Sequence, residues 1–563
     1  LLDDPTLGEE GFTLSVKDDG NLYITGGKWR GCMYGVYELL ERYIGWRFFY
    51  NKQTDSYLTK DADDAYYLYD SEHVDIPAGI NDTQVPSFAY RQGRYTWYYN
   101  YDEHAKLRES RSLRNLSKYN GYGSATFSAA VHGFRDAVNA GVIPDYDYGG
   151  YDIGSPQPCY NNEEVIEAAK TYFLGQIEKK IASGYEIGKD ITVVDVAQLD
   201  SGSFCKCKTC INAIAKERSG VASVLYFTNE MADAIGEAYP GLWVSMFAYY
   251  GTSTPPAKTM PRDNVNVSYC FYNDIDKLTC GNHTLDGKNC TEHPDDSYGT
   301  SNYNYAAEFD RWCQIAKRIT VWYYPGNWAL NSITNSTIKT MLKDMRYFSD
   351  SGVYGIYPCC SNPKKETDWE SIDALMLHLY NRLLWNAEMT EEEFQAEIDD
   401  YLYVLYGEGG KFVGDYYKWL ETTDRIGCWP FMLGFGDPRK RIDFSKVHDE
   451  FELCLSMFDD AIKYAPSAKA EYGVRLASRS MYVRGLISVY HDWYENGNDA
   501  QKARYTELWE YFRDLAVNSS YILSGGKCAV LSDFDISENI GTMVDRFEGS
   551  PTRVSDWYDW QKY

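Results

Sequence analysis

The chain of 563 residues has little positive charge and no long apolar run. Its 55 lysine and arginine residues face 82 aspartate and glutamate residues, which leaves a formal net charge of −27. A surface of this sign repels phosphate groups, which argues against nucleic acids and anionic membrane surfaces as partners. No apolar run approaches the roughly 20 residues that a membrane-spanning helix needs. We therefore expect a globular protein of two or three domains.

Several catalytic motifs are also missing. The glycines of "GGKWRG" lack the spacing of a phosphate-binding loop, and no Gly-x-Ser-x-Gly elbow occurs. The eight histidines include no His-x-x-x-His pair, which argues against a zinc hydrolase. We expect no cofactor. The sequence shows neither a leader peptide nor an initiator methionine, and we expect a trimmed or mature fragment.

Aromatic residues are abundant, with 52 tyrosines and 15 tryptophans. Their rings bury one face while a polar edge stays in water, which suits stacking on sugars. A tyrosine-rich core explains the same composition equally well. The 14 cysteines are few for this length, so an oxidising compartment is compatible with the sequence but not required.

Residues 1–50 are predicted to form a small αβ domain. "FTLSV" at 12–16 and "NLYIT" at 21–25 alternate as strands around the turn "KDDG", and a helical pattern follows a glycine-rich entry. Residues 51–85 are polar with little periodicity, which predicts a linker or one extra hairpin.

Residues 86–390 are predicted to form a (β/α)₈ barrel, because short strand patterns alternate there with helical ones. The predicted strands lie near 87–95, 119–131, 155–160, 190–199, 242–250, 265–273, 319–325 and 352–358. The predicted helices lie near 102–116, 162–183, 219–238, 303–317, 334–349 and 369–386. A doubly wound sheet is the alternative. Residues 391–563 are predicted to be an α-helical region that ends irregularly.

Acidic side chains follow two of the predicted strands. Asp200 ends the strand near 190–199, and Asp274 follows the strand near 265–273, with Asp276 just beyond. Because catalytic groups of a barrel gather at the C-terminal strand ends, these acids are the catalytic candidates. Glycosidic cleavage needs one acid for the leaving oxygen and a second group for the cationic carbon. The alternative is structural, since Asp200 precedes the turn sequence "SGS".

Further polar and aromatic residues lie near the other predicted strand ends, where they would meet sugar hydroxyls or stack on sugar rings. These substrate-binding candidates are Arg91, His132, Gln157, Asn162, Tyr249, Trp322, Tyr324 and Trp328. The expected partner is therefore a glycan. His132 has a structural alternative as a histidine with satisfied hydrogen bonds.

Cys205, Cys207 and Cys210 form a tight cluster just after Asp200. Three interpretations stay open: zinc bound with a fourth ligand from elsewhere, a local disulfide, or buried free thiols. No second cysteine pair or Cys/His pair lies nearby in the sequence. We therefore favour a structural clip beneath Asp200, either zinc or disulfide, over a catalytic metal.

Several stretches together resemble known families. One N-terminal stretch is similar to the small αβ domain found before the barrel in bacterial α-glucuronidases and β-hexosaminidases. It reads "GFTLSVKDDGNLYITGGKWRGCMYGVYELLERYIGWRFF". Four further stretches resemble the bacterial family called domain of unknown function 4838. They are "VAQLDSGSFCKCKTC", "YFTNEMADAIGEAYPGLWVSMFAYYGTSTPP", "ITVWYYPGNW" and "LYNRLLWNAEM". Part of that family is classed as glycoside hydrolase family 163, endo-β-N-acetylglucosaminidases that act on complex N-glycans. The resemblance covers most of residues 11–420.

The resemblance implies a barrel with Asp200 as the acid of the fourth strand, in a secreted or cell-surface bacterial protein. The chain departs from the family pattern at three strand ends. Asn273-Asp274 stands where a Glu is expected, Trp322-Tyr323-Tyr324 where Trp-Asp-Tyr is usual, and Tyr357-Pro358-Cys359 where Phe-Glu-Gln is usual.

These observations predict a glycoside hydrolase that acts on β-linked N-acetylhexosamine in host glycans. Asp200 would orient the N-acetyl group or act as the acid, with Asp274 as its partner. Two alternatives remain: a catalytically degenerate, carbohydrate-binding barrel, favoured by the missing acids, and a hydrolase for a uronic acid. The last would need an arginine or lysine pair at the barrel mouth. The sequence indicates no particular oligomeric state.

Overall fold

The fold was analysed in a computed structural model of the chain. It describes residues 4–91, 132–271, 305–358, 374–423 and 442–488, with gaps at 9, 28–30, 49–64, 68–74, 145–155, 189–190, 324–337, 479 and 486, and short pieces at 503, 521–523 and 526–528. Within these ranges, none of the helices has the length and apolar character needed to cross a bilayer.

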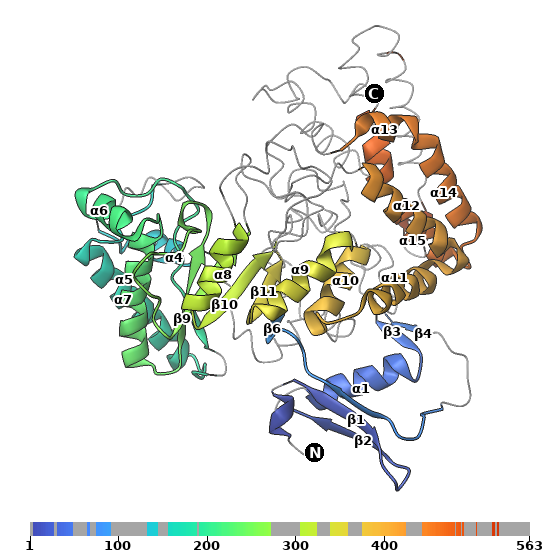
Figure 1. The fold of residues 1–563 in the computed structure, drawn as a ribbon, viewed down its shortest axis with the longest axis horizontal. Coiled ribbons are helices and arrows are strands. Elements are labelled where there is room, and N and C mark those ends of the chain that lie inside the picture. Colours follow the sequence, from blue (N-terminus) through green and yellow to red (C-terminus); the bar gives the residue numbers. More distant parts are fainter. Residues whose placement is uncertain are drawn as a thin grey trace.

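The N-terminal unit is a small antiparallel sheet covered by one helix (Figure 1). Its strands are β1 (Phe12–Val16), β2 (Leu22–Gly26) and β5 (Asn81–Gln84), in the order β2-β1-β5, and its helix is α1 (Gly31–Arg42). A short 3₁₀ turn, Pro5–Leu7, precedes β1, and β3 (Trp46–Phe48) pairs with β4 (Ala65–Tyr67) in a separate hairpin. The turn between β1 and β2 contains Gly20 at φ +76°, a conformation that favours glycine.

The structure adds the strand β5 where the sequence predicted a linker or one extra hairpin. β5 lies inside residues 51–85 and pairs with β1 in antiparallel register. Its sequence, Asn-Asp-Thr-Gln, has no apolar residue, which is why alternation did not reveal it. Pairing with β1 supplies the backbone hydrogen bonds that this segment needs.

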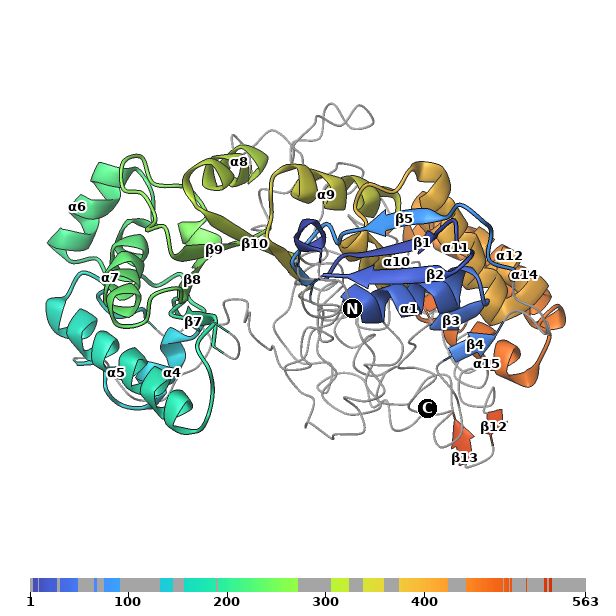
Figure 2. The same ribbon diagram turned by 90° about the horizontal axis from the view of Figure 1, so that it is seen from below.

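A six-stranded parallel sheet forms the centre of the molecule. Its strands are β6 (Tyr90–Arg91), β7 (Val193–Asp195), β8 (Trp243–Ala248), β9 (Val265–Cys270), β10 (Arg318–Tyr323) and β11 (Gly355–Pro358), in the order β6-β11-β10-β9-β8-β7. All neighbouring strands are parallel. The sheet curls, as the run from β7 to β10 in Figure 2 shows. The mixed α/β class with a curled parallel sheet is thereby confirmed.

The first and last predicted barrel strands are neighbours in this sheet. β6 pairs with β11, so Tyr90 lies opposite Gly355. Such a pairing closes a (β/α)₈ barrel, whereas the strand order of a doubly wound sheet would separate these strands. The predicted strand at 119–131 lies outside the described residues, and residues 156–160 form no strand. The described sheet is therefore a half-barrel, and the complete barrel stays a prediction.

Helices alternate with the strands along the chain. They are α4 (Phe134–Asn139), α5 (Glu163–Ala182), α6 (Lys208–Glu217), α7 (Ala222–Ala238), α8 (Tyr305–Ile315), α9 (Ile338–Asp350) and α10 (Ala374–Trp385), with a 3₁₀ turn, η3, at Tyr250–Thr252. Five of the six predicted helices are confirmed to within a few residues, and the sixth, 102–116, lies outside the described residues.

The two faces of the parallel sheet differ in chemistry. Alternate residues such as Val244, Val267 and Val321 pack into the large apolar core that includes the helices. On the other face, the Asn266 amide donates to the hydroxyls of Ser245 and Thr320, each at 3.0 Å. Because successive side chains of a strand point to opposite faces, the second set lines the concave side. Hydrogen bonding makes burial of these polar groups tolerable.

Up to residue 488, the described part of the C-terminal region is mainly helical, where the sequence predicted helices, and a later hairpin was not predicted. It contains α11 (Glu391–Tyr406), η4 (Gly407–Gly409), α12 (Gly410–Thr423), α13 (Phe444–Asp449), α14 (Phe451–Lys463) and α15 (Ala468–Ala477), followed by the hairpin of β12 (Tyr521–Leu523) and β13 (Gly526–Cys528). α11 begins with a capping box, in which Thr390 and Glu393 each bind the other's backbone N–H.

Ion pairs join α1, α10 and α11, which lie side by side in both views (Figures 1 and 2). Arg382 on α10 lies 2.9 Å from Glu41 of α1 and 2.5 Å from Glu397 of α11. Burial raises the pKa of Glu397, but Arg382 and His378 outweigh it and the net shift is downward. Glu397 therefore stays ionised and holds the three helices together.

Candidate active site

Asp200 lies beyond the C-terminal end of β7, beside a histidine and a tyrosine. Its Oδ1 accepts a hydrogen bond from the Tyr249 hydroxyl at 3.2 Å and lies 3.9 Å from His132 Nε2. The side chain of Asp200 is 33% exposed and that of His132 is 15% exposed. Three residues far apart in sequence thus meet at the rim of the sheet, and the carboxylate remains accessible to a ligand.

His132 is held in an unusual backbone conformation. Its φ is +57°, in the left-handed region that residues other than glycine rarely adopt. The next residue, Gly133, passes so close to β7 that a Cβ there would lie 2.1 Å from the Asp195 carbonyl oxygen. This close approach requires glycine at 133 and holds the backbone next to His132 against the end of β7. Backbone strain of this kind often marks functional sites.

The tautomer of His132 follows from its hydrogen bond. Nδ1 lies 2.5 Å from the Gln198 carbonyl oxygen, which can only accept, so Nδ1 carries the proton. Burial lowers the pKa of His132, and the opposing effects of Asp200 and the Gln198 carbonyl do not restore it. The neutral ring therefore presents an unprotonated Nε2 toward the Asp200 carboxylate. Two acceptors that face each other in this way can share a donor group from a ligand.

Aromatic rings cover the concave side of the sheet next to Asp200. Phe247 lies 4.8 Å from the His132 ring and 5.1 Å from Trp322, measured between centroids. Trp322 in turn packs 4.4 Å from Tyr357. Trp322 is only 6% exposed, and its indole N–H has no hydrogen-bond partner among the described residues. A ligand acceptor that reached the ring edge would satisfy that donor.

Gln157 supports the loop that carries Asp200. Its side-chain amide donates to the carbonyls of Leu199 at 2.6 Å and Ser201 at 2.8 Å, one on each side of Asp200. Its carbonyl oxygen accepts from the Leu199 N–H and the Tyr160 hydroxyl. A buried amide with these four partners has no capacity left for a sugar. We therefore assign Gln157 a positioning role in place of the predicted contact with substrate.

Asn162 and Arg91 also lie in structural positions. Asn162 is the N-cap of α5, where its side chain accepts from the Glu164 N–H at 3.0 Å. Arg91 is fully buried, and its guanidinium donates to Glu10 at 2.6 Å. Burial lowers the pKa of Arg91, but Glu10 and Tyr34 outweigh it, so the net shift is upward. Neither geometry presents the side chain to the concave side, and both residues are left out of the proposed site.

Three of the predicted site residues, Asp274, Tyr324 and Trp328, lie outside the described residues. The catalytic pair and two of the sugar-stacking positions therefore stay predictions. Of the predicted set, the structure brings Asp200, His132 and Tyr249 together, and Trp322 lies near them through Phe247.

The cysteine cluster has a fourth member that sequence reasoning missed. The sulfurs of Cys159, Cys205, Cys207 and Cys210 all lie within 4.8 Å of one another, and none of these cysteines is in a disulfide. The sequence signal was present in "QPCYNN", whose glutamine and asparagine were singled out while its cysteine was not. Hydrogen bonding with the Cys210 backbone and thiol lowers the pKa of Cys207 to about 7, whereas burial raises that of Cys159.

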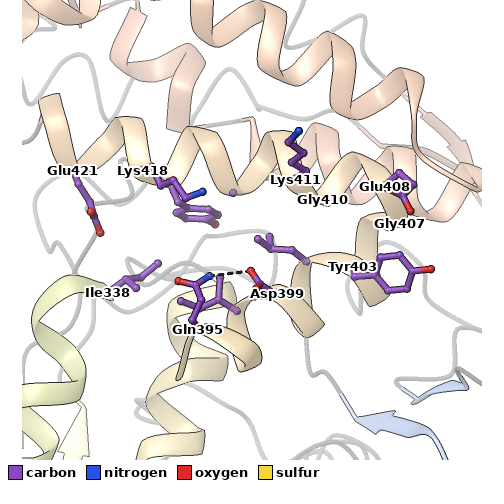
Figure 3. Close-up of a pocket in the computed structure, with 14 residues that line it drawn as sticks. Ile338, Gln395, Asp399, Tyr403, Gly407, Glu408, Gly410, Lys411, Lys418 and Glu421 are labelled. Carbon is purple, nitrogen blue, oxygen red and sulfur yellow. Dashed lines mark hydrogen bonds between the residues drawn. The ribbon is translucent and has the colours of Figure 1, made fainter. Parts of the chain in front are cut away.

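A separate groove of about 350 Å³ lies between α11 and α12. Figure 3 shows Gln395 and Asp399 on α11, joined by a 2.9 Å hydrogen bond, with Lys411 and Lys418 on α12. None of the sequence-predicted site residues lines it. The aromatic rim around Asp200 is therefore the candidate site.

Solved structures with a similar fold are glycoside hydrolases. A family GH115 4-O-methyl-α-glucuronidase with specificity for decorated arabinogalactans has a TM-score of 0.50 at 13% identity, over 91% of this chain and 69% of its own. A family 89 glycoside hydrolase from Clostridium perfringens, in complex with PUGNAc, has a TM-score of 0.51 at 11% identity, over 99% and 70%. Its complex with its substrate GlcNAc-α-1,4-galactose has a TM-score of 0.51 at 11% identity, over 100% and 71%. At these identities the likeness establishes a shared fold.

The sequence family is also established. The chain belongs to the family described as domain of unknown function (DUF4838), whose model matches residues 62–418. This confirms the resemblance to that family, whereas the relation to glycoside hydrolase family 163 stays a prediction. No curated protein matches the sequence.

Proposed function

We propose that this chain is a glycoside hydrolase that acts on β-linked N-acetylhexosamine in complex glycans, as a secreted or cell-surface protein. The observation that carries the proposal is the accessible Asp200 carboxylate, placed between the Tyr249 hydroxyl and the neutral His132 ring at the rim of a curled parallel sheet. Rims of this kind hold the catalytic groups of barrel enzymes. The fold shared with glycoside hydrolases supports the same class.

Asp200 and His132 suit the N-acetyl group of such a sugar. The 3.9 Å between Oδ1 and Nε2 separates two acceptors, and the amide N–H of the N-acetyl group is a donor that both would attract. With its N–H held there, the acetamido carbonyl oxygen attacks the anomeric carbon while the glycosidic C–O bond breaks. The Tyr249 hydroxyl, which donates to Asp200, stabilises the carboxylate during this step.

A second acid completes the reaction. It gives its proton to the leaving glycosidic oxygen and then takes a proton from the water that opens the cyclic intermediate. Asp274 is our candidate from the sequence, because it comes shortly after the end of β9 in the chain and catalytic groups of barrels gather after the C-terminal strand ends. The sugar ring would lie against the wall of Phe247, Trp322 and Tyr357.

α-Linked N-acetylhexosamine is a second candidate substrate. The family 89 enzyme from Clostridium perfringens shares the fold, and its substrate GlcNAc-α-1,4-galactose carries the α-linkage. A uronic acid substrate has less support. The GH115 enzyme of similar fold is a glucuronidase, but Arg91, the arginine among the substrate-binding candidates, is buried against Glu10.

The test compares aryl glycosides that differ in one feature. The panel contains the β- and α-N-acetylglucosaminides, the β-N-acetylgalactosaminide, the β-glucoside and the β-glucuronide, together with released N-glycans. We expect turnover of the β-N-acetyl substrates and none of the β-glucoside, since the 2-acetamido group is the nucleophile. Turnover of the α-anomer instead would support the second candidate.

Asp200→Asn is the decisive variant. We expect kcat/KM to fall by about 10³-fold, the scale of losing a catalytic carboxylate, while calorimetry still detects glycan binding. Asp263→Asn, an exposed residue in the turn before β9, is the matched control and should retain full activity. A fully active Asp200→Asn variant would remove this residue from the mechanism. Binding without turnover of any substrate by the unaltered protein would favour a carbohydrate-binding scaffold.

A further inference from the structure

We propose that Cys159, Cys205, Cys207 and Cys210 together bind one zinc ion as a structural site. Three of the sulfur–sulfur distances are 3.5 Å for Cys207–Cys210, 3.6 Å for Cys159–Cys210 and 3.8 Å for Cys159–Cys207. Zinc–sulfur bonds of about 2.3 Å in a regular tetrahedron place the sulfurs about 3.8 Å apart. These three sulfurs are therefore already spaced as ligands of one tetrahedral ion, and the Cys205 sulfur lies within 4.8 Å of each of them.

Several groups around the cluster suit the negative charge of a zinc–thiolate centre. Zinc with four thiolates carries a net charge of about −2, which needs nearby donors and positive charge. The Asn161 side-chain amide donates to the Cys210 sulfur at 3.3 Å. Cys207 is the N-cap of α6, a ten-residue helix, so its sulfur lies near the positive end of the helix dipole. Lys206 and Lys208 flank Cys207 in the chain.

The ligand set indicates a structural role. Four protein thiolates fill the tetrahedral positions and leave no site for water or substrate, which is the arrangement of structural zinc. The ligands come from two segments that are 51 residues apart between Cys159 and Cys210. A bound ion would therefore cross-link the segment before α5 to the segment that enters α6.

The cross-link lies next to the Asp200 loop. Gln157, two residues before Cys159, bonds to the carbonyls on both sides of Asp200. Its backbone N–H also donates to the Ser203 carbonyl at 2.9 Å. The hydrogen bonds of Gln157 link the two segments as far as residue 203. The ion would add links as far as residue 210 and hold the Asp200 loop next to α5. The metal site is independent of the proposed hydrolase chemistry, since it can be measured without any substrate.

The first measurement is the metal content of the purified full chain, kept reduced, by inductively coupled plasma mass spectrometry. We expect about one zinc ion per chain. Cys159→Ser and Cys207→Ser should lose most of it, because each removes one of four ligands. Cys313→Ser is the matched control, since Cys313 lies on α8 outside the cluster, and it should keep the ion. Retention of full zinc by Cys159→Ser would overturn the four-cysteine assignment.

A second measurement covers the case in which the serine variants fail to fold. Unaltered protein reconstituted with Co²⁺ should show the intense visible absorption of tetrahedral thiolate ligation. A thiol-blocking reagent should release the bound ion, which a coloured chelator then detects. Iron in place of zinc would overturn the identity of the ion. Disulfides among the four cysteines, found by non-reducing peptide mass spectrometry in metal-free protein, would overturn the site itself.

Discussion

The surroundings of Asp200 and Arg91 differ, although both charged residues stand at the ends of strands of the same curled sheet. Asp200 is one-third exposed and shares its rim with His132 and Tyr249. Arg91 is completely buried and paired with Glu10 of the N-terminal unit. The first position can meet a ligand, whereas the second joins two parts of the fold.

Strand alternation explains the difference. Tyr90 points to the concave side, where it joins the cluster that contains Phe247 and Trp322. Arg91, one residue later, must point to the opposite face. There it meets Glu10 and lies 5.3 Å from the ring of Trp385, which packs into the core of the N-terminal unit. A residue at a strand end belongs to the site only when its side chain also points inward.

The largest expected effect is a loss of stability on changing Glu10, the charged partner of Arg91. It tests the contrast between the Arg91 and Asp200 strand ends. Glu10→Gln leaves the Arg91 guanidinium buried without its charged partner, and we expect the free energy of unfolding to fall by about 3–5 kcal/mol. Denaturant unfolding measures this loss. Asp459→Asn, on the exposed side of α14, is the control and should change stability little.

The same variant tests where Arg91 acts. At a temperature where Glu10→Gln remains folded, kcat/KM should stay close to that of the unaltered protein, since Arg91 does not face the site. A Glu10→Gln variant as stable as the control, or one with a large loss of kcat/KM while folded, would break the contrast between the two strand ends.

A smaller effect concerns pH at the Asp200 rim. His132 has a lowered pKa in the folded protein because of burial, so the unfolded chain binds a proton at higher pH than the folded chain does. Stability should therefore fall as pH is lowered below about 6.5, the ordinary pKa of histidine. His132→Gln should make this slope shallower by at most about 1.4 kcal/mol per pH unit.

Unfolding curves between pH 8 and pH 5 check this slope, using about three pH points on each side of the histidine pKa. His448→Gln is the matched control, because His448 lies on α13, outside the Asp200 rim, and is more exposed. An equal slope in the His132→Gln variant and the unaltered protein would contradict a buried, neutral His132.

The smallest effect concerns Asn162. Asn162→Ala removes the N-cap of α5 and should cost about 1 kcal/mol of stability, with kcat/KM nearly unchanged. Asn162→Ser, which keeps a capping oxygen, should recover most of the loss. If Asn162→Ala instead lowers kcat/KM more than tenfold and leaves stability intact, the residue contacts substrate and the site is wider than we propose.

Much of the architecture could be predicted from the sequence because local patterns encode it. Short runs rich in Tyr, Val and Ile located β8, β9 and β10, and helical spacing located α5 and α7. β5 escaped prediction because it contains no apolar residue and is stabilised by a partner strand distant in sequence. Sequence patterns over a few residues cannot reveal a strand that depends on such a distant partner.

The candidate site was predictable only in part. Asp200, His132 and Tyr249 were all among the predicted residues, and the structure brings them together. The roles of Gln157 and Asn162 were not predictable, because a strand-end amide that brackets a loop or caps a helix looks the same in sequence as one that binds a sugar.

The sequence by itself determined the acidic charge, the family, most of the helices and strands, and the cluster of Cys205, Cys207 and Cys210 beside Asp200. Only the tertiary structure decided that Cys159 completes the cluster, that Arg91 turns away from the concave side, and that His132 faces Asp200. The physical reason is that propensity and periodicity act over a few residues, whereas these contacts depend on strand pairing and side-chain direction across the whole sheet.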